Sequence, residues 1–388
     1  MGLTIREARG QRWDIFCAVV DNYGDIGVSW RLARQLAVEH GLKVRLWVDD
    51  LASLQPILPE ISPALETQQT FDGIEVRRWP TPFLLVEPAE VVIEAFGCAL
   101  PPRYIDAMAE LPRQPVWINL EYLSAEQWVG ECHGLSSPHP RLPLLKYFFF
   151  PGFTPETGGL LAESGLAQRR RTFQEGLGHK HAFWQSIGLP APEADECRIS
   201  LFGYENPALP GLLAAWRDAS SPITCLVPEG RLVPGTAEFL GLNGLDCGRD
   251  YERGSLTVRV LPFMNQVRYD DFLWACDLNF VRGEDSFVRA QWAARPLVWH
   301  IYPQQEDAHW VKLEAFLDRY CAALPLEVAS GVRAFWGAWN KGSGAGEAWQ
   351  GFWQHRAALE QHAQHWADGL LSQSGLAANL VQFCNKRL

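Results

Sequence analysis

The sequence predicts an α/β protein made of two similar-sized halves, each a parallel sheet with helices between its strands. Residues 13–48 read strand, helix, strand, which is the βαβ unit of doubly wound sheets. A second series of short apolar runs begins near residue 198, after a polar, helical linker at 169–188. The length of 388 residues favours two or three domains. We therefore expect two domains of one class with a cleft between them.

The first half begins with a nearly continuous apolar run at 13–20, typical of a buried parallel strand. A loop at 21–27 follows, and apolar residues at helical spacing then predict a helix over 28–39 that Gly41 ends. The next strand spans 43–48. Further strands are predicted at 91–94, 116–119 and 147–150. This half is expected to continue to about residue 175.

The second half repeats the pattern. Its strands are predicted at 198–204, 223–227, 257–260, 278–281 and 297–300. A helix without Gly or Pro is predicted at 286–294. The glycine-rich segment 342–346 is a flexible break, and two or three helices are predicted after it, over 347–388.

Charge and composition exclude several classes of protein. A net charge of -11 argues against nucleic acid as a partner, because phosphate binding needs clustered Lys and Arg. No window has the ~18 apolar residues of a membrane span, and the N-terminus does not resemble a signal peptide. Nine scattered cysteines, without a Cys-x-x-Cys pair, predict buried reduced thiols and a cytoplasmic protein. The 17 tryptophans are expected to be core residues.

An acidic loop, Asp21-Asn22-Tyr23-Gly24-Asp25-Ile26-Gly27, follows the first strand, at the sheet edge where open α/β sheets bind ligands. A dinucleotide-binding turn with Asp49 as the ribose acid is one alternative. The loop lacks Gly-x-Gly-x-x-Gly, however, and its carboxylates would repel a pyrophosphate. A cationic or hydroxylic ligand therefore suits it better, although one of the two Asp residues is also a candidate helix cap.

A second polar segment, Arg282-Gly283-Glu284-Asp285-Ser286, joins a predicted strand to a predicted helix. The first N–H groups of a helix have no internal partner and attract anions. An ordinary turn capped by Asp285 or Ser286 is an equally good interpretation of the pattern. A ligand with both phosphates and hydroxyls would use the whole segment, with Arg282 on phosphate and carboxylates on sugar hydroxyls. A nucleotide sugar is such a ligand.

Aromatic residues end two of the predicted strands: Phe202 and Tyr204 on one, Phe263 on another. A base stacked on an aromatic ring gains ~1–3 kcal/mol, so these rings are candidates for nucleotide binding, with core packing as the alternative. Histidines, cysteines and the Asp49-Asp50 pair show no metal-ligand spacing, and we expect no metal.

The sequence contains six long motifs: Asp-Asn-Tyr-Gly-Asp-Ile-Gly-Val-Ser-Trp-Arg-Leu-Ala-Arg (21–34), Leu-Glu-Tyr-Leu-Ser-Ala-Glu (120–126), Lys-Tyr-Phe-Phe-Phe-Pro-Gly-Phe (146–153), Phe-Gly-Tyr-Glu-Asn (202–206), Arg-Gly-Glu-Asp-Ser-Phe-Val-Arg-Ala-Gln (282–291) and Trp-His-Ile-Tyr-Pro-Gln (299–304). Together they resemble the EarP family, bacterial protein-arginine rhamnosyltransferases that modify elongation factor P. The resemblance runs from about residue 14 to 313, and no motif is matched between about 325 and 350.

The resemblance implies a GT-B fold of two Rossmann-like domains facing a cleft. It places an acceptor-binding domain at 1–178, completed by a C-terminal helix at about 362–388, and a donor domain at 179–361. It implies transfer of rhamnose from dTDP-β-L-rhamnose to one arginine of elongation factor P, with inversion, without metal and without a cofactor beyond the donor.

The resemblance also implies residue roles. Asp25 would be the general base, with Asp21 and Glu284 also needed for activity. The donor would be held by Phe202, Tyr204, Phe263, Gln266, Asp285 and Ser286, and Arg282 is a further candidate for the diphosphate. The acceptor loop would include Asn22, Tyr23 and Gly24. The alternatives are another nucleotide sugar or acceptor, a non-catalytic nucleotide-sugar-binding module and, less favoured by the loop chemistry, a dehydrogenase.

Overall fold

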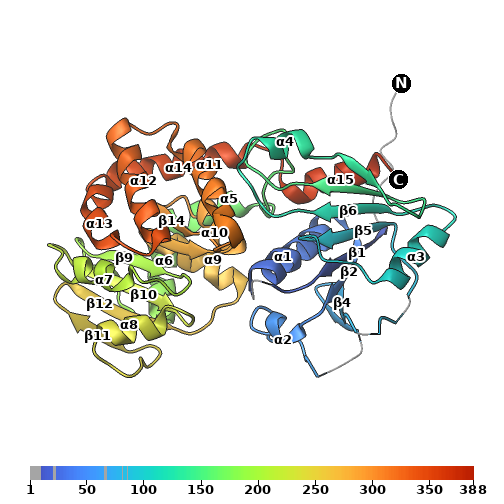
Figure 1. The fold of residues 1–388 in the computed structure, drawn as a ribbon. Coiled ribbons are helices and arrows are strands. Elements are labelled where there is room, and N and C mark those ends of the chain that lie inside the picture. Colours follow the sequence, from blue (N-terminus) through green and yellow to red (C-terminus); the bar gives the residue numbers. More distant parts are fainter. Residues whose placement is uncertain (1–9, 21–22, 65–67, 81, 85) are drawn as a thin grey trace. The chain divides into compact units, whose positions relative to one another are not determined.

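Two sheets, each with its own helices, divide the chain into two units. The computed structural model describes residues 10–20, 23–64, 68–80, 82–84 and 86–388 (Figure 1). Unit 1 comprises Met1–Ser164 and Leu371–Leu388, and unit 2 comprises Gly165–Leu370. The predicted domain boundary at 178 falls inside unit 2, because the helix before it packs there: Phe173 contacts Phe183 and Trp274 of the same unit.

Unit 1 contains an eight-stranded sheet in the order β3-β4-β2-β1-β5-β6-β8-β7. Its strands are β1 (Arg12–Cys17), β2 (Lys43–Val48), β3 (Gln69–Phe71), β4 (Ile74–Arg78), β5 (Val91–Ala95), β6 (Val116–Leu120), β7 (Ser136–Pro138) and β8 (Leu145–Phe149). All pairs are parallel except the edge pairs β3/β4 and β7/β8. Its helices are α1 (Tyr23–His40), α2 (Leu51–Leu54), α3 (Pro102–Glu110), α4 (Trp128–Cys132) and α15 (Leu376–Asn385).

Helices cover both faces of this sheet. On one face the buried cluster includes Ile15 and Ile93 of the sheet, Ile26 and Leu32 of α1, and Leu380 of α15. On the other face Tyr104 and Met108 of α3 pack with strand residues. The C-terminal helix α15 therefore completes the core of unit 1, as Figure 1 shows by its red ribbon beside the green strands.

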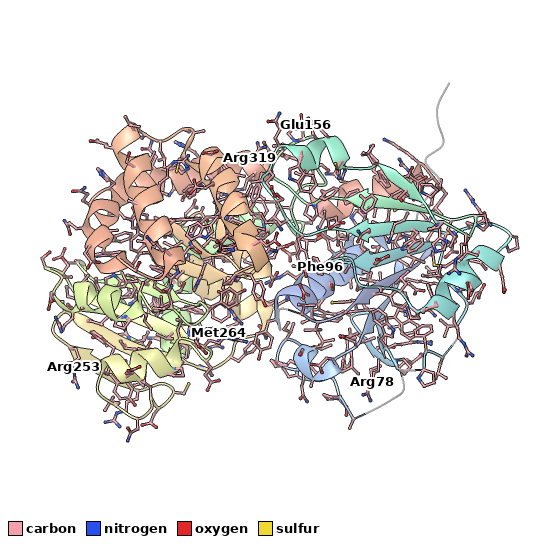
Figure 2. The ribbon with its side chains drawn as sticks, in the orientation of Figure 1. Arg78, Phe96, Glu156, Arg253, Met264 and Arg319 are labelled. Atoms are coloured by element: carbon pink, nitrogen blue, oxygen red, sulfur yellow. The ribbon has the colours of Figure 1, made fainter. Side chains whose placement is uncertain are left out.

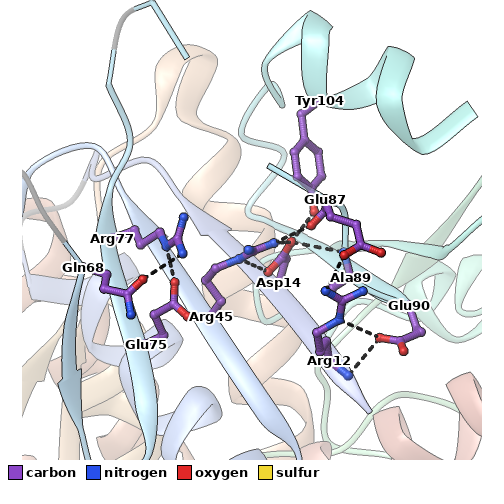
Figure 3. A network of polar contacts seen from close by, with 10 residues as sticks. All are labelled: Arg12, Asp14, Arg45, Gln68, Glu75, Arg77, Glu87, Ala89, Glu90 and Tyr104. Atoms are coloured by element: carbon purple, nitrogen blue, oxygen red, sulfur yellow. Dashed lines mark hydrogen bonds and ion pairs between the residues drawn. The ribbon is translucent and has the colours of Figure 1, made fainter. Parts of the chain in front are cut away.

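A buried polar network fixes β1 against its neighbours (Figure 3). The Asp14 carboxylate is 1% exposed and accepts two hydrogen bonds of 2.6 Å from the Arg45 guanidinium of β2. It also accepts hydrogen bonds from the Tyr104 hydroxyl and from the Ala89 backbone N–H. This bidentate pair lies on the strand itself, away from the carboxyl ends, so we interpret it as structural: it sets the register of β1.

Unit 2 contains a six-stranded sheet in the order β11-β12-β10-β9-β13-β14, parallel except for β11/β12. Its strands are β9 (Cys197–Leu201), β10 (Ile223–Pro228), β11 (Asp250–Arg253), β12 (Leu256–Leu261), β13 (Leu278–Arg282) and β14 (Leu297–His300). Its helices are α5 (Leu166–Glu175), α6 (Leu177–Ser186), α7 (Leu209–Arg217), α8 (Val233–Phe239), α9 (Gln266–Ala275), α10 (Asp285–Trp292), α11 (Ala308–Cys321), α12 (Leu326–Lys341), α13 (Ala345–Trp353) and α14 (Arg356–Leu371).

Two predictions for this part of the chain need correction. The segment 169–188 is helical but is no linker, because Phe183 and Trp184 of α6 are buried in the core of unit 2. The glycine-rich break at 342–346 is short, since α13 begins at Ala345. The three helices after it are confirmed. Twelve of the 17 tryptophans are buried, Trp216, Trp336 and Trp339 fully, whereas Trp128 is 47% exposed, so the expectation of core tryptophans holds for most of them.

The structure also tests the predictions about the cysteines and about membrane-spanning helices. All nine cysteines are free, and seven of them are buried, as predicted. Within the described ranges, no helix combines the length and the apolar character needed to cross a membrane.

Candidate functional site

Both sheets have a topological switch point, and the predicted site residues follow the strands that form it. In unit 1, β1 lies between β2 and β5; in unit 2, β9 lies between β10 and β13. Connections leave such a strand pair in opposite directions, which opens a crevice at the carboxyl ends where ligands bind. Asp25 follows β1. The aromatic pair Phe202 and Tyr204 follows β9, and the segment Arg282–Ser286 ends β13.

Asp25 lies in the first turn of α1 and is 3% exposed. One carboxylate oxygen accepts a hydrogen bond of 2.9 Å from the backbone N–H of Val20, which leaves β1. The neighbouring Val19 N–H donates to Asp49 at 2.9 Å. The carboxylate is thus fixed between the strand end and the helix start, where the dipole favours a negative charge.

The acidic segment differs from the predicted loop, because α1 starts at Tyr23 and not near residue 28. Tyr23, Gly24 and Asp25 therefore form its first turn. Glycine weakens helix propensity, which is why the pattern placed the start too late. Asp25 is not the N-cap, so the capping alternative does not apply to it. Asp21 and Asn22 lie outside the described residues.

Arg282 is the charged centre of the unit 2 site. Its guanidinium carbon lies 4.8 Å from the ring centre of Phe202 and 4.6 Å from that of Tyr204. The residue is only 8% exposed, and its Nη1 is buried without a hydrogen-bond partner among the described residues. A buried cationic N–H without an acceptor is costly, so Arg282 is a candidate for binding an anion.

The turn after β9 brings Tyr204 close to β14. The Tyr204 N–H donates to Nδ1 of His300 at 3.3 Å, and the two rings meet edge to face at 5.2 Å. Burial, together with the charge of Arg282, lowers the pKa of His300 to about 3. His300 is therefore neutral at pH 7, as its acceptor role requires. A Cβ at Gly203 would lie 3.1 Å from that Nδ1, a tighter contact than most side chains make.

The start of α10 differs from the capped turn considered for the sequence. Its N-cap is Glu284, which makes no side-chain capping hydrogen bond. Ser286 accepts a hydrogen bond of 3.1 Å from the Arg282 N–H and donates to the Arg282 carbonyl oxygen. The alternative that Asp285 or Ser286 caps the helix is thus wrong. Gly283 has a φ of 60° at the turn, and its carbonyl accepts from the Trp299 indole at 2.8 Å.

Helix α9 holds the start of α10 in place. Gln266, the first residue of α9, donates to Asp285 at 3.5 Å. Further along, Arg289 of α10 makes hydrogen bonds of 2.8 and 2.6 Å to the buried Asp270 carboxylate. Phe263 precedes this helix, 37% exposed, with its N–H donating to Glu229 at 3.3 Å. The adjacent Met264 is labelled in Figure 2.

Sequence reasoning missed three residues of this site. His300 contacts Tyr204 as described, and Tyr302 meets the Tyr204 ring edge to face at 5.5 Å while remaining 44% exposed. Tyr269 packs against Phe202, and burial raises the pKa of its hydroxyl, which lies beside Ser286. Two of these residues could have been found from their positions in the sequence. Tyr302 follows the end of β14, and Tyr269 lies one helical turn after Gln266.

The described residues contain no group of three or more His, Cys, Asp or Glu side chains placed to hold a metal ion. The Arg282 guanidinium and the first N–H groups of α10 are candidate partners for an anionic ligand.

Comparison with known proteins gives the family. The model of the elongation factor P (EF-P) rhamnosyltransferase family EarP matches residues 13–385. The chain belongs to the EarP family. A protein-arginine rhamnosyltransferase from Pseudomonas aeruginosa is 54% identical over 96% of this chain and 98% of its own length. One from Shewanella oneidensis is 42% identical over 98% of this chain and 99% of its own.

Solved structures agree with this assignment. A structure described as the basis for EarP-mediated arginine glycosylation of translation elongation factor EF-P is 39% identical, with a TM-score of 0.71 over 97% of this chain and 100% of that one. The spinosyn rhamnosyltransferase SpnG is only 12% identical, with a TM-score of 0.52 over 96% of this chain and 99% of that one, and shows the fold alone. Two Rossmann-like units in an EarP family member make this the GT-B fold that the sequence predicted.

Proposed function

We propose that this chain is an inverting glycosyltransferase that moves rhamnose from dTDP-β-L-rhamnose to an arginine side chain of elongation factor P, in the cytoplasm. The single observation that carries the donor half is Arg282: a buried guanidinium beside two aromatic rings, with an Nη1 that lacks a hydrogen-bond partner among the described residues. A nucleotide diphosphate supplies both an anion for the guanidinium and a base for the rings.

The acceptor half needs a carboxylate. Arginine is a poor nucleophile because its guanidinium stays protonated at pH 7. A carboxylate can fix the guanidinium by hydrogen bonds and then take its proton as the C–N bond forms. Asp25 has the fixed position that this role requires, since the Val20 N–H orients its carboxylate. Asp21 is the second carboxylate of the loop and would share the binding of the guanidinium.

The leaving group needs positive charge. As the bond between the sugar carbon and the diphosphate oxygen breaks, negative charge grows on dTDP. Arg282 and the first N–H groups of α10 would stabilise that charge without a metal. Asp285 and Ser286 stand at this helix start, and Glu284 would orient the rhamnose hydroxyls. Phe202, Tyr204 and Phe263 would hold the thymine nucleoside, with Gln266 beside it.

The proposed reaction is a single displacement, which inverts the configuration at the sugar carbon. A single displacement requires the base and the leaving group on opposite faces of the sugar carbon. In this proposal Asp25 of unit 1 would be the base, and Arg282 and α10 of unit 2 would bind the leaving group. The proton of the guanidinium passes to Asp25, and the electron pair of the broken C–O bond stays on the diphosphate.

The deciding experiment is mass spectrometry of intact and digested elongation factor P after incubation with this protein and dTDP-rhamnose. A deoxyhexose on one arginine is the expected result. Parallel reactions with UDP- and GDP-sugars test the donor, and a reaction without enzyme is the control. Equal or greater transfer from another nucleotide sugar would overturn the donor assignment. Binding of dTDP without any transfer would favour a non-catalytic module.

A further inference from the structure

A turn at the end of β5 places an aromatic side chain where the backbone disfavours it. In the turn Ala95–Cys98, the N–H of Cys98 donates to the carbonyl of Ala95 at 3.2 Å. Both central residues are left-handed, Phe96 with a φ of 57° and Gly97 with a φ of 67°. Turns with two positive φ values favour Asn, Asp and Gly, and a bulky residue there is an outlier.

The turn is held firmly in this conformation. The Phe96 N–H donates to the carbonyl of Leu120 at 2.6 Å, and the Gly97 N–H donates to the Asn119 side chain at 3.1 Å. Asn119 in turn donates to the Glu121 carboxylate at 2.6 Å. Strained backbone that neighbouring groups hold in place clusters at functional sites.

The ring of Phe96 stacks on a second ring that follows β6. Its centre lies 4.6 Å from that of Tyr122, with 22° between the planes, and both residues are half-buried. Phe96, which is labelled in Figure 2, comes directly after β5, and Asp25 comes after β1. These strands are adjacent and parallel, and together they form the switch point of unit 1.

This position matches the donor site of unit 2. There the segment that ends β13, beside the central strand β9, carries Arg282. In unit 1 the segment that ends β5, beside the central strand β1, carries Phe96. The switch point of unit 2 thus has a cation packed on aromatic rings. The switch point of unit 1 has aromatic rings and the Glu121 carboxylate, which Asn119 links to the Phe96 turn by hydrogen bonds.

Stacked rings and a carboxylate are together the groups that bind a planar cation. We propose that Phe96, Tyr122 and Glu121 bind the guanidinium of the acceptor arginine and present it to Asp25. The rings would bind the guanidinium face and Glu121 its N–H groups, so that the carbon–nitrogen bond forms at a nitrogen whose proton Asp25 takes. This inference rests on the proposed function and adds the residues that select arginine.

The test separates this role from core packing. Phe96→Leu keeps an apolar side chain but removes the ring. Phe71→Leu is the matched control, because Phe71 packs against the same buried cluster from the edge strand β3. Loss of a cation–ring contact should lower kcat/KM for elongation factor P by roughly 3- to 30-fold in F96L and Y122L, without changing the Kd of dTDP. F71L should stay within about twofold of the unmodified chain.

Y122L leaves the turn sequence intact and decides the question if F96L does not fold. Glu121→Gln, which removes the charge and keeps the shape, should lower kcat/KM less at high salt than at low salt. Values for F96L and Y122L equal to that of F71L would overturn the inference while leaving rhamnosyl transfer established. Absence of transfer by the unmodified chain would overturn the proposed function and this inference with it.

Discussion

Replacing Arg282 by glutamine should weaken dTDP binding without weakening the unliganded fold. Arg282 is 8% exposed, and its guanidinium lies on two rings without an ion-pair partner among the described residues. A hydrogen bond to a charged group contributes ~1.5–3 kcal/mol. Its loss therefore raises the Kd of dTDP by about 13- to 160-fold. The unliganded protein loses a buried charge as well as ring contacts, so its unfolding free energy should not fall.

Thermal unfolding with and without dTDP measures both effects together. At a dTDP concentration of about 100 times the wild-type Kd, binding stabilises the wild-type protein by ~2.7 kcal/mol. At the same concentration the R282Q protein gains only about 0.3 to 1.3 kcal/mol. Isothermal calorimetry gives the Kd directly.

A matched control separates this site from arginine replacement in general. Arg268 on α9 donates to the carbonyl and hydroxyl of Ser186, at 3.1 and 2.9 Å, and is exposed. Arg268→Gln should leave dTDP affinity unchanged. The reasoning about Arg282 is refuted if R282Q binds dTDP as tightly as the wild type. It is also refuted if unliganded R282Q loses several kcal/mol of stability, since Arg282 would then be a structural group.

Four further predictions follow from the site. Asp25→Asn should retain dTDP binding and lose 10²–10⁴-fold in kcat, and near-normal single-turnover rates would remove Asp25 as the base. Replacing Tyr204 or Phe263 by leucine should weaken dTDP binding by ~1–3 kcal/mol in calorimetry, whereas unchanged affinity would assign the rings to the core. Transfer should survive EDTA, and a loss restored by Mg²⁺ would contradict the metal-free proposal. Because the pKa of His300 is lowered to about 3, the unfolded state binds a proton that the folded state does not between about pH 6.5 and 3. As the pH is lowered from about 6.5 to 3, the unfolding free energy should therefore fall by up to ~1.4 kcal/mol per pH unit. Denaturant titrations at each pH measure this dependence, and the unfolding free energy of H300N should depend less on pH.

The strands were predictable because burial on both faces leaves continuous apolar runs. The predicted strands at 43–48 and 297–300 have the observed bounds. The short edge strands β3, β7 and β11 and the inner strand β4, whose burial is only partial, have no such run and were missed. The start of α1 was missed because Gly24 opposes helix formation by propensity alone, while its neighbours Asp25 and Ile26 are held by the tertiary structure.

The sequence predicted those residues of the candidate site that directly follow a strand, but not the contacts between them. Phe202, Tyr204 and Arg282 were each named from a strand end, but their mutual stacking depends on the pairing of β9 with β13. His300 is 96 residues from the Tyr204 N–H that it accepts from, and no local pattern encodes that contact. Phe96 carried no signal, because a lone aromatic residue after a strand has the pattern of a core residue until its φ is known.

Under the two proposals above, the switch points of units 1 and 2 would bind opposite charges. Each unit carries an unfavourable feature there: a buried arginine without an ion-pair partner among the described residues in unit 2, and a left-handed phenylalanine in unit 1. Either feature costs stability in the unliganded protein, of order 1–3 kcal/mol for the strained residue. Core packing explains neither, because an apolar side chain in place of Arg282 or glycine in place of Phe96 would remove the cost. In the proposed reaction the diphosphate would bind at Arg282 and the acceptor guanidinium at the Phe96 turn, so binding of the two substrates would offset both costs.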